Sequence, residues 1–328
     1  MNTLRKIYHK IKQKIEARRY KQECDHWASI PPVKTILKVI PGLTHERQQR
    51  RLCLFSHFDI HGRVDPYVLH YLDQIKKNNF DVVLISTSPS IDPRDFSAVS
   101  ARCRFYIHRT NIGLDFGSWK AAMDYLKDFS EYDELLLAND SVFGPIYDLK
   151  ETFDKFQQMP QKVCGLVDTW EIYYHIQSYF VFFKTEALKS DLFGQFWNNV
   201  KLVLDKNYII ENYEIGLSQH FLRNGFELGA CVEFVELRDY LVNKVGENKF
   251  QYHDRLSREP GNPTLFAWEA LISDRYRFPF IKTELLKYNR LGSKNVVNWR
   301  HLMPPNSEPM IKLISNFLKR TQWNARGC

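Results

Sequence analysis

Short apolar runs alternate along residues 51–139 with segments whose apolar residues recur every three or four positions. The runs predict buried β-strands, and the amphipathic segments predict helices between them. Strands separated by helices are typical of a mostly parallel sheet that helices cover on both faces, so we expect an α/β fold. The predicted strands are 51–57, 81–87, 102–108 and 134–139, and the predicted helices are 65–79 and 117–129.

The alternation continues with a more mixed character beyond residue 149, without a Gly-, Ser- or Pro-rich linker. We therefore expect one α/β domain over residues 51–286, with a basic region at 1–50 and a basic tail at 287–328. Ligands of such sheets lie beyond the carboxyl ends of the strands. The further predicted strands are 162–167, 176–184 and 228–235, and the further helices are 191–204, 210–224 and 263–273.

Charge is distributed unevenly along the chain. Residues 1–51 carry a net charge of +9, as do residues 275–328, whereas residues 52–274 carry −10. A nucleic-acid binder usually places its basic patch on the folded domain together with a recognisable motif, and we find no such motif. Basic ends around an acidic centre indicate contact with an anionic membrane surface and no nucleic acid partner.

Both ends of the chain are predicted to form basic amphipathic helices, whose apolar stripes could enter a membrane interface. The alternative is that each helix packs on its own domain. No apolar run reaches the length of a spanning helix, and no signal-peptide core is present. The stripe residues are Leu4, Ile7, Tyr8, Ile11 and Ile15 at the first end, and Met310, Ile311, Leu313, Ile314, Phe317 and Leu318 at the other.

Several protein classes are excluded or disfavoured. A chain of 328 residues with ordinary composition is neither disordered nor collagen-like. Its six cysteines form no CxxC pair, which favours a reducing, cytosolic compartment. The P-loop, GxGxxG, HExxH and GxSxG signatures are absent. Together with the basic ends, these features predict a cytoplasmic protein that is peripheral at the inner face of the cell membrane.

Two polar clusters follow predicted strands. The first contains Arg109, Asn111 and Asp115 with Gly113 and Gly117, directly before a helix. Such a loop brings backbone close to a phosphate or sugar and presents a helix N-terminus to it. The alternative interpretation is a tight turn in which Asp115 caps the helix.

The second cluster, Asn139-Asp140-Ser141, ends the buried strand 134–139. A carboxylate and a hydroxyl at this edge could bind a hard cation that bridges diphosphate oxygens. An Asx-turn explains the same three residues almost as well.

Four motifs in this order resemble the rhamnan synthesis protein F family, within the GT-A class of nucleotide-sugar glycosyltransferases. The likeness runs from about residue 52 to about residue 286, and includes Asn262-Pro-Thr264 and Lys282-Thr-Glu284. It implies a GT-A-like, Rossmann-type sheet. The motifs are N-x-G-x-D-F-G-S-W at 111–119, N-D-S-V-F-G-P at 139–145, H-x-Q-S-Y-F at 175–180 and Y-E-x-G-x-S at 213–218.

The resemblance implies transfer of a deoxyhexose, favouring L-rhamnose from dTDP-L-rhamnose, onto a cell-surface polysaccharide or lipid-linked glycan. It also implies a DxD position at Asp140 for Mg²⁺ or Mn²⁺, but this sequence has one carboxylate there, which puts metal dependence in doubt. Lys120, Arg109 or Lys282 could neutralise the diphosphate instead. The implied donor-binding residues are Ser56, His57, Asp59, Thr87, Arg109, Asn111, Gly113, Asp115, Trp119, Lys120, Asn139, Asp140 and Ser141.

An inverting transfer needs one carboxylate to take the acceptor hydroxyl's proton. Glu214 is the first candidate and Asp168 the second, although Glu214 could simply favour the start of its helix as an anion. The expected acceptor-binding residues are His175, Gln177, Ser178 and Tyr179.

Two other classes stay open. One is a non-catalytic module that binds a nucleotide sugar or glycan in a membrane-associated assembly, which a single carboxylate at the DxD position allows. The other is a nucleotidyltransferase, although that class would be expected to show a basic, Gly-rich loop after the first strand. This chain has Ser-His-Phe-Asp at 56–59 instead.

Overall fold

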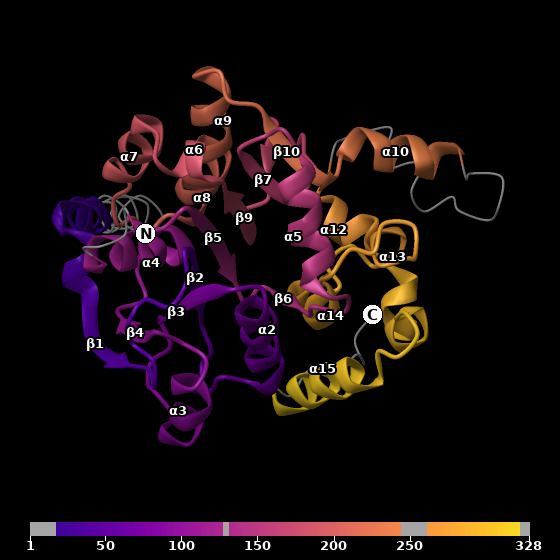
Figure 1. Ribbon diagram of the computed structural model, residues 1–328, viewed down its shortest axis with the longest axis horizontal. Helices are drawn as coiled ribbons and strands as arrows, with labels where there is room; N and C mark the ends of the chain where they lie inside the picture. Colours follow the sequence, from indigo (N-terminus) through magenta and orange to yellow (C-terminus); the bar gives the residue numbers. More distant parts are fainter. Residues whose placement is uncertain (1–17, 127–130, 244–260, 322–328) are drawn as a thin grey trace, which may run out of the picture.

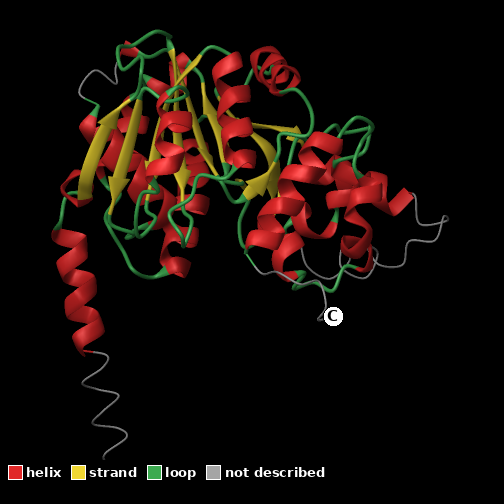
Figure 2. Ribbon diagram, turned by 90° about the horizontal axis from the view of Figure 1, so that it is seen from below, coloured by secondary structure: helices red, strands yellow, loops and turns green. Residues whose placement is uncertain are grey.

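A computed structural model describes residues 18–126, 131–243 and 261–321. Its centre is a parallel sheet in the spatial order β4-β3-β2-β5, flanked by helices (Figures 1 and 2). The predicted α/β fold and all four predicted strands of the first half are confirmed. They are β2 (Arg51–His57), β3 (Phe80–Ser86), β4 (Phe105–Arg109) and β5 (Glu134–Asn139).

The central strands read as continuous apolar runs because both faces of the sheet are buried. Every residue of β3 is buried, and apolar side chains pack in one cluster on each side of the sheet. Helix α2 (Pro66–Lys77) covers one face, and α4 (Leu114–Tyr125) covers the other. Helix α4 begins three residues earlier than predicted, and α3 (Pro93–Ser100) was not predicted.

The sheet continues at both edges with antiparallel strands. Strand β1 (Ile36–Pro41) pairs with β4, and β9 (Phe180–Phe183) lies between β5 and β7 (Val163–Thr169). Strand β10 (Leu228–Val232) is parallel to β7. The predicted strand 176–184 is wrong as one element, because β8 (His175–Ile176) pairs with the end of β7 and residues 177–179 turn away before β9.

The second half includes the helices α5 (Leu149–Gln158), α6 (Thr185–Leu188), α7 (Asp191–Asn198), α8 (Lys206–Ile209), α9 (Ile215–Arg223) and α10 (Phe234–Asn243). The predicted helices 191–204 and 210–224 correspond to shorter helices in the structure, and the helices α5, α6 and α10 of this half were not predicted. The predicted helix 210–224 is one continuous helix whose hydrogen-bond pattern changes along its length. It begins with the π-helical segment η3 (Ile210–Glu214) and becomes α-helical at Ile215. A π-helical turn inside a helix is rare and often marks a functional position.

The last part of the chain returns to the carboxyl edge of the sheet. Strand β11 (Ile281–Lys282) pairs antiparallel with β6 (Val142–Phe143), which follows directly after β5. The predicted helix 263–273 is divided into α12 (Pro263–Phe266) and α13 (Trp268–Leu271). The remaining elements are α14 (Thr283–Tyr288), η5 (Lys294–Leu302) and α15 (Glu308–Arg320).

Helix α15 lies in the region 287–328, which was expected to be a basic tail in contact with a membrane, but it packs on the folded domain. All six apolar residues of its stripe belong to, or pack against, the core cluster beside α2 (Figure 1). Its last residue, Arg320, pairs with the carboxylates of Asp59 and Asp65. Residues 287–321 are therefore part of the same folded unit as the sheet, and this stripe is not free to enter a membrane.

At the other end, residues 18–29 form a largely exposed helix that stands away from the sheet (Figure 2). The 3-10 turn η1 (Pro32–Thr35) joins it to β1. The expected stripe of Leu4, Ile7, Tyr8, Ile11 and Ile15 lies outside the described residues. None of the described helices combines the length and the apolar character needed to span a bilayer.

Candidate active site

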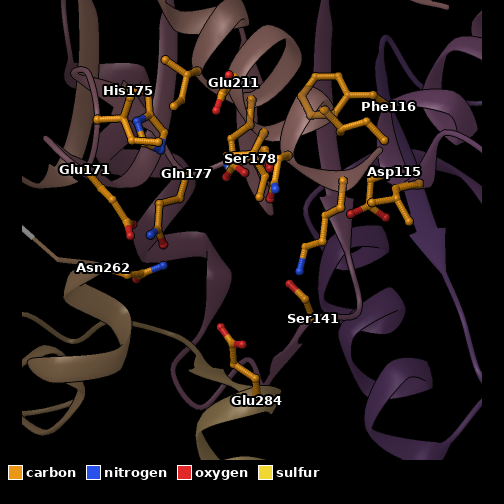
Figure 3. Close-up of a pocket in the computed structure, with 18 of the residues that line it drawn as sticks. Asp115, Phe116, Ser141, Glu171, His175, Gln177, Ser178, Glu211, Asn262 and Glu284 are labelled. Atoms are coloured by element: carbon orange, nitrogen blue, oxygen red, sulfur yellow. The ribbon is translucent and has the colours of Figure 1, made fainter. Parts of the chain in front are cut away.

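A cavity of about 470 Å³ opens at the carboxyl edge of the sheet, where β5 ends and α4 begins. Figure 3 shows Glu171, His175 and Gln177 on one side of it, with Asp115 and Ser141 opposite. The wall combines segments from most of the chain. The lining residues are 114–116, 141, 171–172, 175, 177–178, 206–207, 209–211, 214–215, 262 and 282–284.

The loop before α4 forms one wall. Gly113 has φ 75° and Leu114 has φ 47°, a left-handed conformation that costs a branched residue steric strain. These two residues turn the chain so that Asp115 lies in the first turn of α4 and lines the cavity. Burial raises the pKa of Asp115, and hydrogen bonds from Ser56 and Asn139 partly offset that rise.

Arg109 supports this loop from behind. Its guanidinium donates to Thr35 Oγ1 at 3.0 Å, to Ser118 Oγ at 3.1 Å and to the Ile112 carbonyl at 2.7 Å. The side chain is 1% exposed, and burial lowers the pKa of Arg109 to about 10. Arg109 was predicted to bind the donor. Its guanidinium points into the protein, where all three contacts are internal, and the residue does not line the cavity.

The turn after β5 presents Ser141 to the cavity. Asn139 Oδ1 accepts hydrogen bonds from the Ser141 amide at 3.1 Å and from its hydroxyl at 2.6 Å, which is the Asx-type turn given above as the alternative interpretation. Lys282 Nζ lies 3.5 Å from Ser141 Oγ and 4.0 Å from the centre of the Tyr179 ring. Burial lowers the pKa of Lys282, while Glu214, Glu284 and Asp115 act in the opposite direction.

Asp140 points away from this cavity, toward the end of β2. Its Oδ2 accepts the Phe58 amide at 3.0 Å and lies 3.9 Å from His57 Nε2. Burial raises the pKa of Asp140 to about 8 and lowers that of His57 to about 4. His57 is further held by Ser86 Oγ, 3.1 Å from its Nδ1. At neutral pH the pair is therefore largely uncharged.

The surroundings of Asp140 do not form a protein site for Mg²⁺ or Mn²⁺. Across residues 18–126, 131–243 and 261–321, no three His, Cys, Asp or Glu side chains converge on one point. Asp140 is also the one carboxyl group that the Asn-Asp-Ser sequence offers to a hard cation, which binds carboxylate oxygens. The described residues therefore supply too few ligands to hold such a cation on their own.

Glu214 lies at the junction of η3 and α9 and faces the loop between β8 and β9. Its Oε1 accepts the Ser178 amide at 3.1 Å, and the residue lines the cavity. Glu214 therefore reaches the cavity as a carboxylate held in place by one backbone donor.

Asp168, the second predicted base, has a different role. Its carboxylate accepts the Phe234 amide at the start of α10, and burial raises the pKa of Asp168 to about 6. It does not line the cavity. Of the four predicted acceptor residues, His175, Gln177 and Ser178 line the cavity, whereas Tyr179 lies beneath Lys282 and is 2% exposed.

Most of the remaining predicted donor residues make internal contacts outside this cavity. Asp59 accepts the amides of His61 and Arg63 and pairs with Arg320, and Thr87 donates its amide to the His57 carbonyl. Trp119 is fully buried and donates to the Ala138 carbonyl at 3.3 Å. Lys120 pairs with Asp124, and Asn111 is exposed beside the loop.

Several cavity residues were not among the predicted site residues. Asn262, Thr283 and Glu284 lie in motifs that contributed to the family resemblance, and Glu211 is one turn before the predicted base. The sequence motifs could therefore have identified these positions as site residues. Glu171, Lys206 and Asn207 carry no local signal, because they come to the cavity only through the packing of the β7–β8 loop and α8.

Comparisons with known proteins point to one family. The family model described as Rhamnan synthesis protein F matches residues 82–296. The "Virulence protein VirA" of Vibrio anguillarum is 29% identical over 252 residues, which cover 70% of this chain and 78% of that protein. The "Uncharacterized protein y4gN" of Sinorhizobium fredii is 27% identical over 164 residues, covering 48% of this chain and 43% of that protein.

Two solved glycosyltransferases show a weak overall likeness. The mannosyltransferase PcManGT from Pyrobaculum calidifontis, in complex with GDP-Man and Mn²⁺, has 10% identity and a TM-score of 0.39, covering 93% of this chain and 88% of that one. The galactosyltransferase LgtC, with donor and acceptor sugar analogs, has 12% identity and a TM-score of 0.36, covering 79% and 99%. At these scores nothing about substrate or metal follows for this chain.

Replacing Asp140 by Asn should change how stability depends on pH. Because the folded-state pKa is raised from 3.8 to about 8, the folded protein keeps a proton that the unfolded chain has lost across that window. Asp140 therefore favours folding at low pH, and this contribution declines as pH rises. Relative to wild type, Asp140→Asn should gain up to about 1.4 kcal/mol in free energy of unfolding for each pH unit.

Chemical denaturation between about pH 5 and about pH 8 measures this difference. Asp154→Asn, at an exposed carboxylate on α5, is the control for removing one negative charge. Identical pH dependence in the two variants would contradict the assigned protonation of Asp140.

Proposed function

The chain belongs to the rhamnan synthesis protein F family, and on that premise we propose that it is a glycosyltransferase. We propose that it transfers L-rhamnose from dTDP-L-rhamnose to a cell-surface polysaccharide or lipid-linked glycan. The observation that carries the proposal is the cavity, where the carboxylate of Glu214 and the ammonium group of Lys282 line one space at the carboxyl edge of the sheet. An inverting transfer from a nucleotide sugar uses a base for the acceptor hydroxyl and a positive charge beside the leaving diphosphate.

Lys282 is the proposed partner of the donor diphosphate. In the described part of the chain its Nζ meets a hydroxyl and an aromatic ring, and no carboxylate at ion-pair distance. An ammonium ion that is partly buried and lacks a direct counter-ion favours an anionic ligand. Ser141 beside it offers a hydroxyl to the same phosphate oxygens.

Glu214 is the proposed base of an inverting transfer. Its carboxylate takes the proton of the acceptor hydroxyl as that oxygen bonds to the anomeric carbon of the donor. The bond from the anomeric carbon to the diphosphate oxygen breaks, and the electron pair leaves with the nucleoside diphosphate beside Lys282. Asp115 lines the cavity on the side of α4 and is proposed to hold a sugar hydroxyl.

Changing Glu214 to Gln should remove the base while keeping its shape. We expect transfer to slow about 100- to 10,000-fold and the Kd for the donor to stay within about twofold. Steady-state kinetics and calorimetric titration with dTDP-L-rhamnose measure the two quantities. Glu227→Gln, at an exposed glutamate outside the cavity, is the matched control.

The result also separates an enzyme from a non-catalytic binding module. Donor binding without turnover in the wild-type chain, for every acceptor tried, would favour the module. A Glu214→Gln variant with full activity would assign the base elsewhere.

Changing Lys282 to Met should weaken binding of the donor by about tenfold or more, because the diphosphate loses its nearest cation. UDP- and GDP-linked sugars, tested beside dTDP-L-rhamnose, identify the base and sugar that the cavity accepts. Lys201→Met, at an exposed lysine that does not line the cavity, is the control.

The same assay tests the metal. We expect transfer to continue in EDTA at close to its full rate. Loss of activity in EDTA, restored by Mg²⁺ or Mn²⁺, would instead return Asp140 to the role of a metal ligand.

We further propose that the protein is peripheral at the cytoplasmic face of the membrane through its first, basic residues. The free cysteines among the described residues, Cys24, Cys53, Cys103, Cys164 and Cys231, support a reducing compartment. Because the apolar stripe of α15 is buried in the core, we assign membrane contact to the first, basic residues of the chain.

Replacing Lys10, Lys12 and Lys14 by Gln should therefore weaken binding to vesicles that contain phosphatidylglycerol. Each lysine contributes on the order of 1 kcal/mol, so the loss should be roughly 100-fold in co-sedimentation. The control changes Lys150, Lys155 and Lys189, which are exposed on the folded domain. Equal binding of the two triple variants would contradict the proposed surface.

A further inference from the structure

A second depression of about 630 Å³ lies on the outer side of η3 and α9, between them and α7. We propose that this groove binds the sugars that precede the acceptor residue in a neutral glycan chain. The inference rests on the proposed function, because it takes the first cavity as the place of transfer. It adds a separate subsite, which we call the chain groove, outside the four residues expected to bind the acceptor.

The chain groove adjoins the catalytic cavity. Glu211 and Ile215 line both spaces, so a single helical turn forms their shared wall. Ile172 also lines the cavity, and its chain neighbour Tyr173 lines the groove. In this proposal, a chain whose last hydroxyl reaches Glu214 passes over the shared turn into the groove.

The backbone at Ile172 supports this arrangement. Ile172 has φ 68°, which is a strained conformation for a β-branched residue, and its side chain is 61% exposed. Strain of this kind persists where the surrounding structure holds it, and it concentrates at binding sites. Here it lies where the wall passes from the cavity to the groove.

The polar groups of the chain groove suit hydroxyl groups. Asn199, Asn212 and Asn224 each donate their side-chain amide nitrogen to the backbone carbonyl four residues earlier, at 2.8 to 3.1 Å. Gln219 donates in the same way to the Tyr174 carbonyl at 2.8 Å. These bonds fix the side chains and leave the amide oxygens as acceptors for sugar hydroxyls.

Two tyrosines on the groove are exposed to solvent. Tyr173 is 64% exposed and Tyr208 is 45% exposed, and both line the groove. An aromatic ring presents a flat apolar face, and a tyrosine adds a hydroxyl at its edge. That combination fits a sugar ring, which has an apolar face and a polar rim.

The charge of the groove favours a neutral chain. Glu211 and Arg223 are its two formally charged residues and have opposite signs, and the Nε2 atom of His220 is 2.9 Å from the Leu192 carbonyl. An acidic polysaccharide would place its charges beside Glu211 without a cluster of cations to offset them. The volume lies within the range of about 300–1,000 Å³ that is usual for ligand sites.

A pair of glycines provides a sharp test. Gly216 lines the groove, and a Cβ atom there would meet only the Glu211 carbonyl oxygen, at an ordinary 3.6 Å. Gly194 in α7 lies outside the lining, and a Cβ there would meet nothing within 4 Å. Gly216→Gln should therefore obstruct the groove, and Gly194→Gln is the matched control with the same change in another helix. Tyr173→Ala is a second test, at a side chain whose exposure leaves the core intact.

The probes are L-rhamnose and linear rhamno-, manno- and malto-oligosaccharides of two to five sugars, titrated into the full chain by ligand-observed NMR. We expect one series to bind about tenfold more tightly at three or more sugars than at one. Gly216→Gln and Tyr173→Ala should abolish that gain, whereas Gly194→Gln should keep it. All three variants should bind dTDP-L-rhamnose as the wild type does.

The outcomes separate this inference from the proposed function. Transfer to a monosaccharide with no gain from longer chains in any series, or equal loss in both glycine variants, overturns the chain groove and leaves the transferase. Length-dependent binding that Gly216→Gln abolishes, without transfer to any acceptor, supports the groove and overturns the transferase.

Discussion

The candidate site depends on a two-residue strand pairing at the carboxyl edge of the sheet. Strand β11 pairs with β6 at Ile281 and Lys282, and the Thr283 amide donates to the Ser141 carbonyl at 2.9 Å. So short a ladder is not stable in isolation. It is held because Phe143, Phe280, Ile281 and Leu285 are buried in the common core. Without this pairing the cavity would lack its proposed diphosphate partner, Lys282.

Polar side chains at this edge divide into two layers. An inner layer satisfies buried groups, as unpaired polar atoms in a core cost free energy. Arg109 fixes the loop before α4, Asp140 accepts the Phe58 amide after β2, and His57 contacts Ser86 Oγ. An outer layer, which includes Asp115 and Glu214, lines the cavity. The inner groups thus shape the site through the backbone they hold, and need not touch a ligand.

The same division explains what the sequence could predict. Apolar runs identified the central strands, and polar residues after them identified the edge at which the cavity opens, because parallel strands end together. However, a residue's position after a strand does not tell which way its side chain points. Asn139, Asp140 and Ser141 are consecutive, yet Ser141 faces the cavity and Asp140 faces β2. Lys282 and Ser141 are 141 positions apart, and their approach follows from tertiary packing that no local pattern encodes.

The cavity's charge places constraints on what each part of it can hold. Asp115, Glu171, Glu211, Glu214 and Glu284 line it, with Lys206 and Lys282 as the lysines. Burial raises the pKa of Asp115 and of Glu171, which is the response expected when carboxylates share a partly dry space. A diphosphate is therefore tolerated near Lys282 and disfavoured beside Glu171 and Glu211. The acidic side of the cavity is left for a neutral acceptor, whose hydroxyl groups can donate to these carboxylates.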